Sequence, residues 1–302
     1  MSKFQKELQL ASDLVRKAAE ITEWFRKTGF KTIEKKDHSP VTLADYAGQI
    51  FINNSIRETF PADQLFAEEH IEDLADSQEE IIKKCFKDLN IPIKKFESNL
   101  NYRGEPSERQ WTIDPIDGTR GFVANLSYSI GIGFLVNSEP TISAIGSPNY
   151  NEKGLAVFRA ELGEGSQASY GGKAFIPIET STKSNLKESR VCISLHNASK
   201  ATLDFLSKIG IKEENRYAMD GMGKFCMVAD ATADFYIHLN RNLMYSWDFC
   251  PGDLLIREAK GSSSDIGGKR LKFKERKCII TAPGYLFSNK ELPQTIFKLF
   301  KK

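Results

Sequence analysis

The sequence lacks the features that mark secreted, disulfide-bonded or membrane-spanning chains. Its 302 residues contain no C-x-x-C pair and five scattered cysteines: Cys85, Cys192, Cys226, Cys250 and Cys278. An odd number of isolated cysteines argues against a disulfide framework or a structural zinc site, so we expect reduced thiols. No stretch approaches the roughly 18 apolar residues of a membrane span. The N-terminus also lacks the long apolar run of a secretory signal.

An excess of charge of either sign is also missing. The 42 Lys and Arg residues nearly balance the 40 Asp and Glu residues, which leaves a net charge of +2. No global field therefore favours a nucleic acid or a membrane surface as partner. With 40% hydrophobic, 11% aromatic and 27% charged residues, the composition is typical of a soluble globular protein. We expect a cytoplasmic protein whose partner is a small molecule. The composition says nothing of its oligomeric state.

Apolar periodicity predicts a mixed α/β protein. Apolar residues recur at three- and four-residue spacing over residues 5–26, which indicates an amphipathic helix. A second helix is expected from Thr42, as N-cap, to Pro61. The polar stretch 179–185 has no apolar residue and predicts a boundary between an N-terminal domain, 1–182, and a C-terminal α/β domain, 183–302.

The remaining expected elements follow from shorter patterns. Before the boundary, a helix is expected at 79–87 and strands at 64–67, 110–113, 128–136, 141–146, 155–160 and 173–178. After it, the expected order is a strand at 190–195, a helix after Asn197, a strand at 233–239, a helix after Pro251, a strand at 278–281 and a terminal helix through Ile296 and Leu299.

The strongest chemical signal is the segment Asp114-Pro115-Ile116-Asp117-Gly118-Thr119. A strand delivers Asp114 to its carboxyl end, the proline disfavours a helix there, and Gly118 permits a sharp turn. Two carboxylates three residues apart on such a turn converge on one spot, and Mg²⁺ prefers oxygen ligands of that kind. The backbone N–H groups of Gly118 and Thr119 suit a phosphate. An Asp-x-x-Asp-Gly turn also occurs as a purely structural loop.

Two further acidic features accompany this turn. Glu68 and Glu69 follow an apolar strand, which places a carboxylate pair at the edge of a sheet. Asp248 lies at the expected start of a helix, where an isolated aspartate is most often a cap.

Together these motifs resemble the inositol monophosphatase superfamily of lithium-sensitive, magnesium-dependent phosphatases. The three motifs occur in the family's order, and the resemblance extends from about Pro40 to Ala259. It implies a layered αβαβα, sugar-phosphatase-like fold with the metal site between the two halves of the chain.

Within the superfamily, the sequence is most similar to the 3'(2'),5'-bisphosphate nucleotidases. Pro40–Tyr46 resembles their Pro-Val-Thr-x-x-Asp-Tyr segment. Gly118–Phe122 resembles their Gly-Thr-Lys-Gly-Phe segment, with arginine in place of lysine. Gly146–Asn149 resembles their Gly-Cys-Pro-Asn segment. Gly221 and His238 depart from the family, which has serine and arginine there. The resemblance implies hydrolysis of 3'-phosphoadenosine 5'-phosphate to AMP, in sulfur assimilation. Its alternatives are an inositol monophosphate or inositol polyphosphate 1-phosphatase, and a non-catalytic member that binds metal or nucleotide.

The resemblance also implies roles for residues. Glu69 and Asp114 would hold a first Mg²⁺ together with the Ile116 carbonyl, while Asp114, Asp117 and Asp248 would hold a second; two or three ions are expected. Asp45 and Thr119 would activate the attacking water. The implied substrate contacts are Gly118, Thr119, His196, Lys224, His238 and Asp248. From the residues alone, Asp45 reads equally as an exposed acid opening a helix, His196 as a strand-end histidine and Lys224 as a surface lysine.

Overall fold

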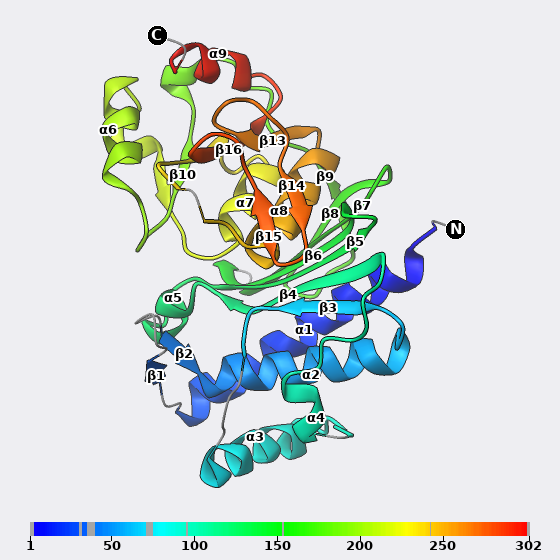
Figure 1. The fold of residues 1–302 in the computed structure, drawn as a ribbon. Helices are drawn as coiled ribbons and strands as arrows, with labels where there is room; N and C mark the ends of the chain where they lie inside the picture. The colour runs from blue at the N-terminus through cyan, green and yellow to red at the C-terminus, as the bar shows by residue number, and fades with distance from the viewer. Residues whose placement is uncertain are drawn as a thin grey trace.

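Helices and sheets alternate in five layers (Figure 1). The computed structural model describes residues 3–29, 32–34, 40–70, 75–94, 96–152, 154–241 and 243–300. The polar segment from Lys35 to Pro40 predicts a loop because it ends in proline, and most of it lies outside the described residues. In order, the layers are a helical pair, a large sheet, a second helical pair, a smaller sheet and two outer helices. The layered αβαβα fold expected from the resemblance is confirmed.

The large sheet contains seven strands in sequence order, β3-β4-β5-β6-β7-β8-β9. Its strands are β3 (Gln64–Ala67), β4 (Arg109–Asp117), β5 (Ser129–Val136), β6 (Glu139–Asn151), β7 (Gly154–Glu161), β8 (Gly165–Tyr170) and β9 (Ile176–Ile178). Only the β3–β4 pair is parallel; each later pair is antiparallel. The strand expected at 173–178 is wrong in extent, because β9 begins at Ile176 and the unpredicted β8 precedes it.

Two long helices cover one face of this sheet. They are α1 (Gln5–Thr28) and α2 (Leu43–Thr59), which pack on each other and on β4, β5, β6 and β7. Thr42 is the N-cap of α2, as predicted, and forms a capping box with Asp45. The short helices α3 (Asp76–Asp88) and α4 (Phe96–Leu100) lie outside this pair, and the hairpin of β1 (Thr32–Glu34) and β2 (Pro40–Thr42) precedes α2.

The other face of the large sheet is covered by α7 (Gly223–Ala229) and α8 (Ser246–Glu258). The prediction that this helix starts after Pro251 is wrong, because Pro251 lies inside α8. A proline there has no N–H to donate and so forfeits one helical hydrogen bond. The Pro251 carbonyl accepts a bond from Ser143 Oγ at 2.7 Å, which ties α8 to β6. Close packing needs glycine on β5: a Cβ on Gly133 would lie 2.7 Å from Cys250 Sγ.

The smaller sheet lies beyond α7 and α8, in the order β11-β10-β12-β16-β13. Its strands are β10 (Val191–Ile193), β11 (Arg216–Ala218), β12 (Phe235–Leu239), β13 (Gly261–Asp265) and β16 (Gly284–Asn289). The outer helices α6 (Lys200–Lys208) and α9 (Pro293–Lys298) pack on its far side. The strand expected at 278–281 belongs instead to a separate hairpin of β14 (Lys272–Lys274) and β15 (Lys277–Ile279). Single 3₁₀ turns occur at η1 (Leu186–Glu188) and η2 (Glu213–Asn215).

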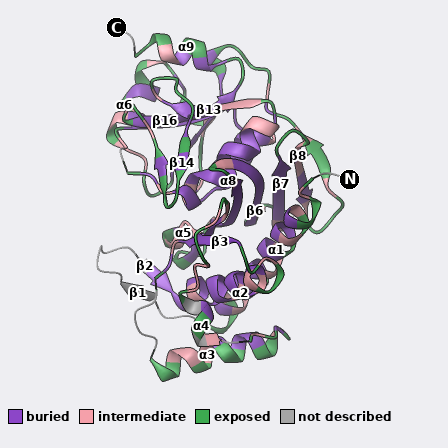
Figure 2. Cartoon of the chain, turned by 45° about the vertical axis from the view of Figure 1, so that its right-hand side comes forward, coloured by how far each residue is buried: buried purple, intermediate pink, exposed green. Residues whose placement is uncertain are grey.

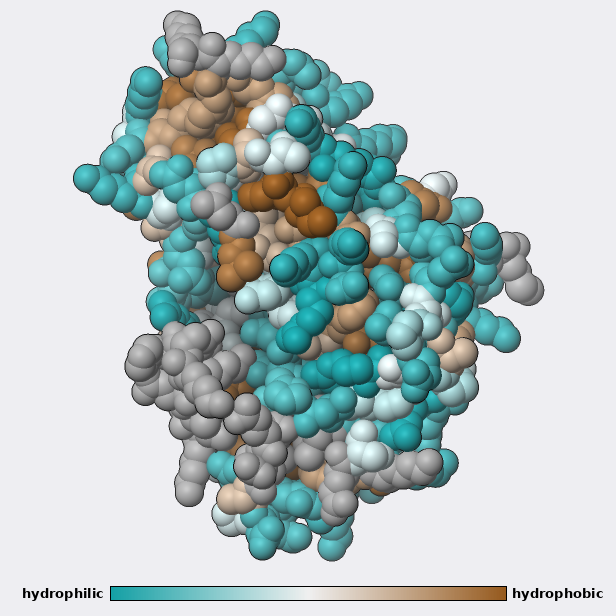
Figure 3. Space-filling model, in the orientation of Figure 1, coloured by the Kyte–Doolittle hydropathy of each residue, from teal (hydrophilic) through white to brown (hydrophobic). Residues whose placement is uncertain are grey.

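Burial follows the layers. The strands next to α8 and most of α8 itself are buried, whereas α3 and α9 carry exposed faces (Figure 2). All five cysteines are free and buried. No helix among the described residues is long and apolar enough to cross a membrane. Hydrophilic residues predominate on the face drawn in Figure 3.

The two sheets fall on either side of residue 182, but α8 from the second half packs against strands of the first. The proposed two-domain division therefore stays a prediction.

Candidate active site

The turn after β4 presents two acidic side chains at the carboxyl end of a buried strand. The pairing of β4 with β5 shifts register between Asp114 and Asp117, so the strand is irregular where its acids lie. Asp114 is buried, and its Oδ1 accepts a hydrogen bond from the Ile116 N–H at 3.0 Å. Gly118 then takes a left-handed φ of 92° as N-cap of the short helix α5 (Thr119–Val123). Glycine at this position is what permits the turn.

Four carboxylates from three segments act on one another here: Glu68 after β3, Asp114 and Asp117 on β4, and Asp248 in the first turn of α8. Burial raises the pKa of Asp114 well above its usual value, and the charges of Glu68, Asp117 and Asp248 raise it further. Burial, and then Asp117 and Glu68, raise the pKa of Asp248 to about 8. The pKa of Asp117 is raised to about 6, chiefly by burial. The pKa values of these acids stay raised, so the neighbouring positive charges compensate them only in part.

Glu68 and Glu69 have different surroundings. The Glu68 charge raises the pKa of Asp114, Asp117 and Asp248, so its side chain belongs to the acidic cluster. Glu69 is 2% exposed, and the Gln49 side chain bonds both its backbone N–H and its carbonyl, at 2.9 and 2.7 Å. The structure thus brings Glu68 to the other acids, although the family resemblance favours Glu69. The metal-binding role of Glu69 stays a prediction.

The donor chemistry of this cluster fits a hard divalent cation. Carboxylate oxygens and the nearby Ile116 carbonyl are ligands that Mg²⁺ prefers, and a bound cation would lower the pKa values that burial and repulsion raise. No three His, Cys, Asp or Glu side chains among the described residues already stand at the spacing of a ligand shell.

Two basic side chains border the acidic cluster. Arg241, just beyond β12, lies with Nη2 3.7 Å from Asp248 Oδ2. Lys224 on α7 is mostly buried, and its Nζ donates to the Gly221 carbonyl at 2.6 Å. Both charges lower the pKa of Asp117, against the larger effect of its burial. Lys224 was predicted as a site residue, whereas Arg241 was not. The sequence marks Arg241 only as a basic residue directly after a strand that leads into the site.

His238 lies deeper than a surface substrate contact. It is 9% exposed and stacks on Tyr285, with ring centroids 5.6 Å apart. Burial, followed by the charges of Arg241 and Lys224, lowers the pKa of His238 to about 4. The ring is therefore neutral near pH 7.

The predicted pair of Asp45 and Thr119 lies on neighbouring segments. Asp45 follows β2, and β2 packs against α5, which begins at Thr119. Asp45 is buried, and its Oδ2 accepts bonds from the Thr42 N–H and Oγ1 at 2.7 and 2.6 Å. Thr119 Oγ1 donates to the Ile116 carbonyl at 3.2 Å. Asp45 thus has a capping role, and its activation of water stays a prediction.

His196 and Gly221 flank the turn from the second half of the chain. The His196 ring bonds the buried carboxylate of Asp220 through Nδ1. Gly221 has a φ of 66°, and a Cβ there would lie 2.4 Å from the Asp117 carbonyl oxygen. A serine therefore does not fit this backbone, which explains physically why the chain departs from the family pattern at Gly221.

Comparisons with known proteins show which proteins this chain is similar to. A sequence profile described as the inositol monophosphatase family matches residues 3–301. A 3'(2'),5'-bisphosphate nucleotidase of Schizosaccharomyces pombe is 29% identical over 89% of this chain and 88% of its own. A 3',5'-bisphosphate nucleotidase 2 of Arabidopsis thaliana is 28% identical over 99% and 97%. The solved structure of a Thermotoga maritima IMPase covers 98% of this chain and 97% of its own, with a TM-score of 0.72 and 22% identity.

Proposed function

The chain belongs to the inositol monophosphatase family, and we propose that it is a magnesium-dependent phosphatase that converts 3'-phosphoadenosine 5'-phosphate to AMP and phosphate. The observation that carries the proposal is the acidic cluster of Glu68, Asp114, Asp117 and Asp248, at the end of a strand and beside a turn suited to phosphate. The bisphosphate nucleotidases of similar length and 26–29% identity support the choice of substrate.

The acidic residues would hold the metal. Glu69, Asp114 and the Ile116 carbonyl are the proposed ligands of one Mg²⁺, and Asp114, Asp117 and Asp248 those of another; a third ion remains part of the proposal. Bound Mg²⁺ supplies positive charge for the phosphate and lowers the pKa of a bound water. Glu68 lies close enough to Asp114 to serve with Glu69 or in its place.

The other side chains would orient the water and the substrate. Asp45 and Thr119 are the proposed base and hydroxyl that position the attacking water. Backbone N–H groups of Gly118 and Thr119 would hold phosphate oxygens. His196, Lys224 and His238 complete the proposed substrate contacts, with His238 acting as a neutral hydrogen-bonding ring.

Basic residues favour a substrate with two phosphates over one with a single phosphate. Lys224 and Arg241 bring two positive charges to the border of the acidic cluster. Once Mg²⁺ neutralises the acids, these charges are available to a second phosphate of the same substrate.

A substrate panel with Mg²⁺ tests the proposal. Phosphate release is measured for 3'-phosphoadenosine 5'-phosphate, inositol 1-phosphate and inositol 1,4-bisphosphate at equal concentrations. We expect the nucleotide to have the highest kcat/KM and lithium to inhibit its hydrolysis. A preference of about tenfold or more for either inositol compound would overturn the choice of substrate. No release from any of them would favour a binding protein.

We also place the protein in the cytoplasm and in sulfur assimilation, as parts of the same proposal. Five buried free thiols fit a reducing compartment. Cell fractionation, and growth on sulfate after deletion of the gene, test these two points.

A further inference from the structure

We propose that Asp220 is a positioning residue that fixes the imidazole of His196 beside the Asp114–Thr119 turn, so that the ring meets the substrate in one orientation. The inference rests on the proposed function, since it assumes that His196 touches the phosphorylated substrate. Asp220 precedes α7 in a loop, and nothing in the sequence pattern marked it.

The Asp220 carboxylate is nearly enclosed and receives three hydrogen bonds. It is 3% exposed. Its Oδ1 accepts bonds from the His196 N–H at 3.3 Å and from Ser194 Oγ at 3.4 Å, and its Oδ2 pairs with His196 Nδ1. Both the backbone and the ring of His196 are therefore held by one carboxylate.

Asp220 is itself fixed against the turn. Its N–H donates to Ser127 Oγ at 3.0 Å. A Cβ on Gly121 would lie 3.1 Å from Asp220 Oδ2, and one on Gly118 would lie 3.3 Å from the Asp220 Cβ. The two glycines leave room for Asp220 directly against the segment that is proposed to hold phosphate. The aspartate thus joins the β10–α6 loop, which carries His196, to the turn after β4.

The pairing determines which ring nitrogen is available. A carboxylate only accepts hydrogen bonds when ionised, so Nδ1 must carry the proton. Nε2 is then the nitrogen left for a ligand, and the His196 side chain is 31% exposed. Without Asp220 the ring has both tautomers and several rotamers, and binding must order it. We expect that ordering to weaken substrate binding roughly five- to tenfold.

The first test reads the tautomer directly in the full-length protein. ¹⁵N NMR of the histidine side chains is recorded without substrate, and the His196 signal is assigned by its loss in His196→Gln. We expect the proton of the neutral ring to lie on Nδ1. A neutral His196 ring with its proton on Nε2 would overturn the proposal. This readout does not depend on whether any phosphate ester is hydrolysed, so it separates failure of this inference from failure of the proposed function.

The second test is a double-mutant cycle of Asp220→Asn and His196→Ala. Each single change should raise KM by roughly five- to tenfold with little change in kcat, and the double variant should match His196→Ala. If the effect of Asp220→Asn persists in full without His196, the aspartate acts by another route and the inference is wrong. If Asp220→Asn does not fold, the NMR measurement on the unchanged protein decides.

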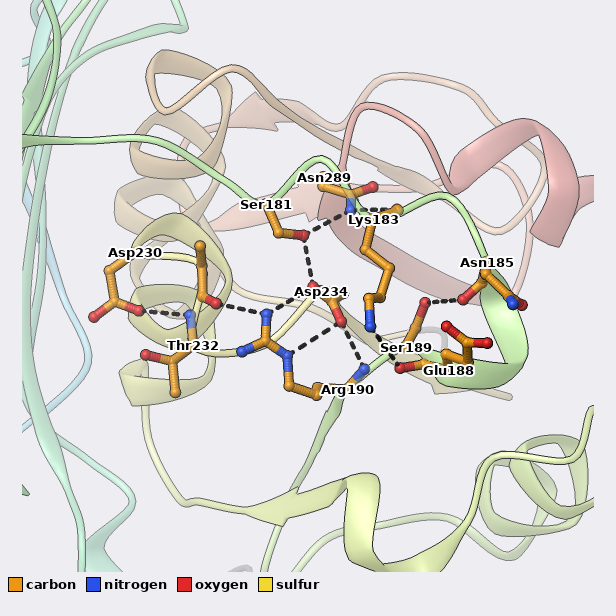
Figure 4. Close-up of polar contacts among 11 residues, drawn as sticks. Ser181, Lys183, Asn185, Glu188, Ser189, Arg190, Asp230, Thr232, Asp234 and Asn289 are labelled. Carbon is orange, nitrogen blue, oxygen red and sulfur yellow. Dashed lines mark hydrogen bonds and ion pairs between the residues drawn. The ribbon is translucent and has the colours of Figure 1, made fainter.

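Asp234→Asn is the matched control. Asp234 is a buried aspartate that bonds Ser181 and Arg190 away from the turn (Figure 4). Its loss should lower the melting temperature and leave KM unchanged. A rise in KM equal to that of Asp220→Asn would show that any buried aspartate of this half has the same effect, and would overturn the specific role of Asp220.

Discussion

Two groups of buried carboxylates in this protein have opposite surroundings. At the turn after β4, acids face other acids, and the pKa values of Asp114, Asp117 and Asp248 are all raised. Near the start of β12, Asp234 is fully buried, whereas Asp117 and Asp248 are half-buried. Hydrogen bonds from Arg190 and Ser181 nevertheless outweigh the burial of Asp234 and lower its pKa. Its Oδ1 lies 3.0 Å from Arg190 Nη2 (Figure 4).

The difference separates structural from functional use of a charge. Asp234 is paired within the protein, so its charge stabilises the fold. The acids at the turn repel one another, and Lys224 and Arg241 offset this repulsion only in part. The protein therefore retains these acids at a cost in stability that an added cation would relieve. Enclosure alone therefore does not identify a site; the sign of the neighbouring charges does.

The largest expected effect is on turnover, from Asp117→Asn. The change should lower kcat by roughly a thousandfold, because metal clamping contributes several kcal/mol to the transition state. The fold should remain intact, since the variant removes one repelling charge. Phosphate release with Mg²⁺ measures the rate, and circular dichroism checks the fold. Retained magnesium-dependent turnover would refute the metal assignment.

Asp234→Asn should have the opposite profile. The change removes the carboxylate that the half-exposed Arg190 guanidinium and the Ser181 hydroxyl share, and should lower the free energy of unfolding by about 2 kcal/mol. Urea denaturation measures this loss. Activity per folded molecule should stay within about twofold of the original. An unfolding free energy equal to that of the unchanged protein would mean that Asp234 and Arg190 do not stabilise the fold.

The two groups also predict the pH dependence of stability without metal. For an acid with a raised pKa, the folded state binds more protons than the unfolded state, so stability falls as pH rises. The pKa of Asp117 is about 6 and that of Asp248 about 8, so the melting temperature should fall as the pH rises from about 4 to about 8. Asp234 has a lowered pKa and loses its contribution only below about pH 4.

Thermal unfolding in a metal chelator measures this slope, and Asp248→Asn should flatten it. Added Mg²⁺ should raise the melting temperature most at the alkaline end. A melting temperature that rises steadily to pH 8 without metal would contradict the mutual repulsion of the acids.

Restoring the family's serine at position 221 should harm the protein. Gly221→Ser forces a side chain into a left-handed backbone against the Asp117 carbonyl, which should cost about 2 kcal/mol of stability. Gly210→Ser is the control, because Gly210 also has a left-handed backbone but has open space around it. The difference in unfolding free energy between the two variants measures the clash with the Asp117 carbonyl apart from the backbone strain that both share. Equal losses in both variants would show that the contact with Asp117 is unimportant.

The smallest expected effect concerns Arg241. Arg241→Gln should raise KM for the bisphosphorylated nucleotide roughly tenfold and alter that for a monophosphate much less, because one charge-assisted contact is lost. Steady-state kinetics on both substrates measure the ratio. An equal rise in KM for both substrates would mean that Arg241 acts only through its ion pair with Asp248 and does not contact the second phosphate.

Much of the fold was predictable because its helices and most strands of the large sheet follow apolar periods. Two of the missed strands, β8 and β13, bury several polar residues. Ser166 on β8 is buried because its hydroxyl bonds the Leu255 carbonyl at 2.7 Å, and β13 buries Ser263, Ser264 and Asp265. The two partners of such a contact lie far apart in the sequence, so no local pattern predicts it.

The site was predictable in its acids and less so in its surroundings. The turn from Asp114 to Thr119 and the acid Asp248 stand out because their spacing carries the chemistry. Asp220 and Arg241 lie in loops of the second half, and they act on Ser127 and Asp117 of the first half. The approach of the two halves is set by packing around α8, which a reading of single segments cannot show.

The position of α8 has a consequence for the order of synthesis. The last strand of the large sheet ends at Ile178, but the helix that covers its inner face spans Ser246–Glu258. A growing chain must therefore hold an uncovered apolar sheet while another seventy or so residues leave the ribosome. The same helix carries Asp248, so the folding step that covers the sheet also brings the last acid to the site. A chain that lacks α8 therefore cannot form the complete acidic cluster.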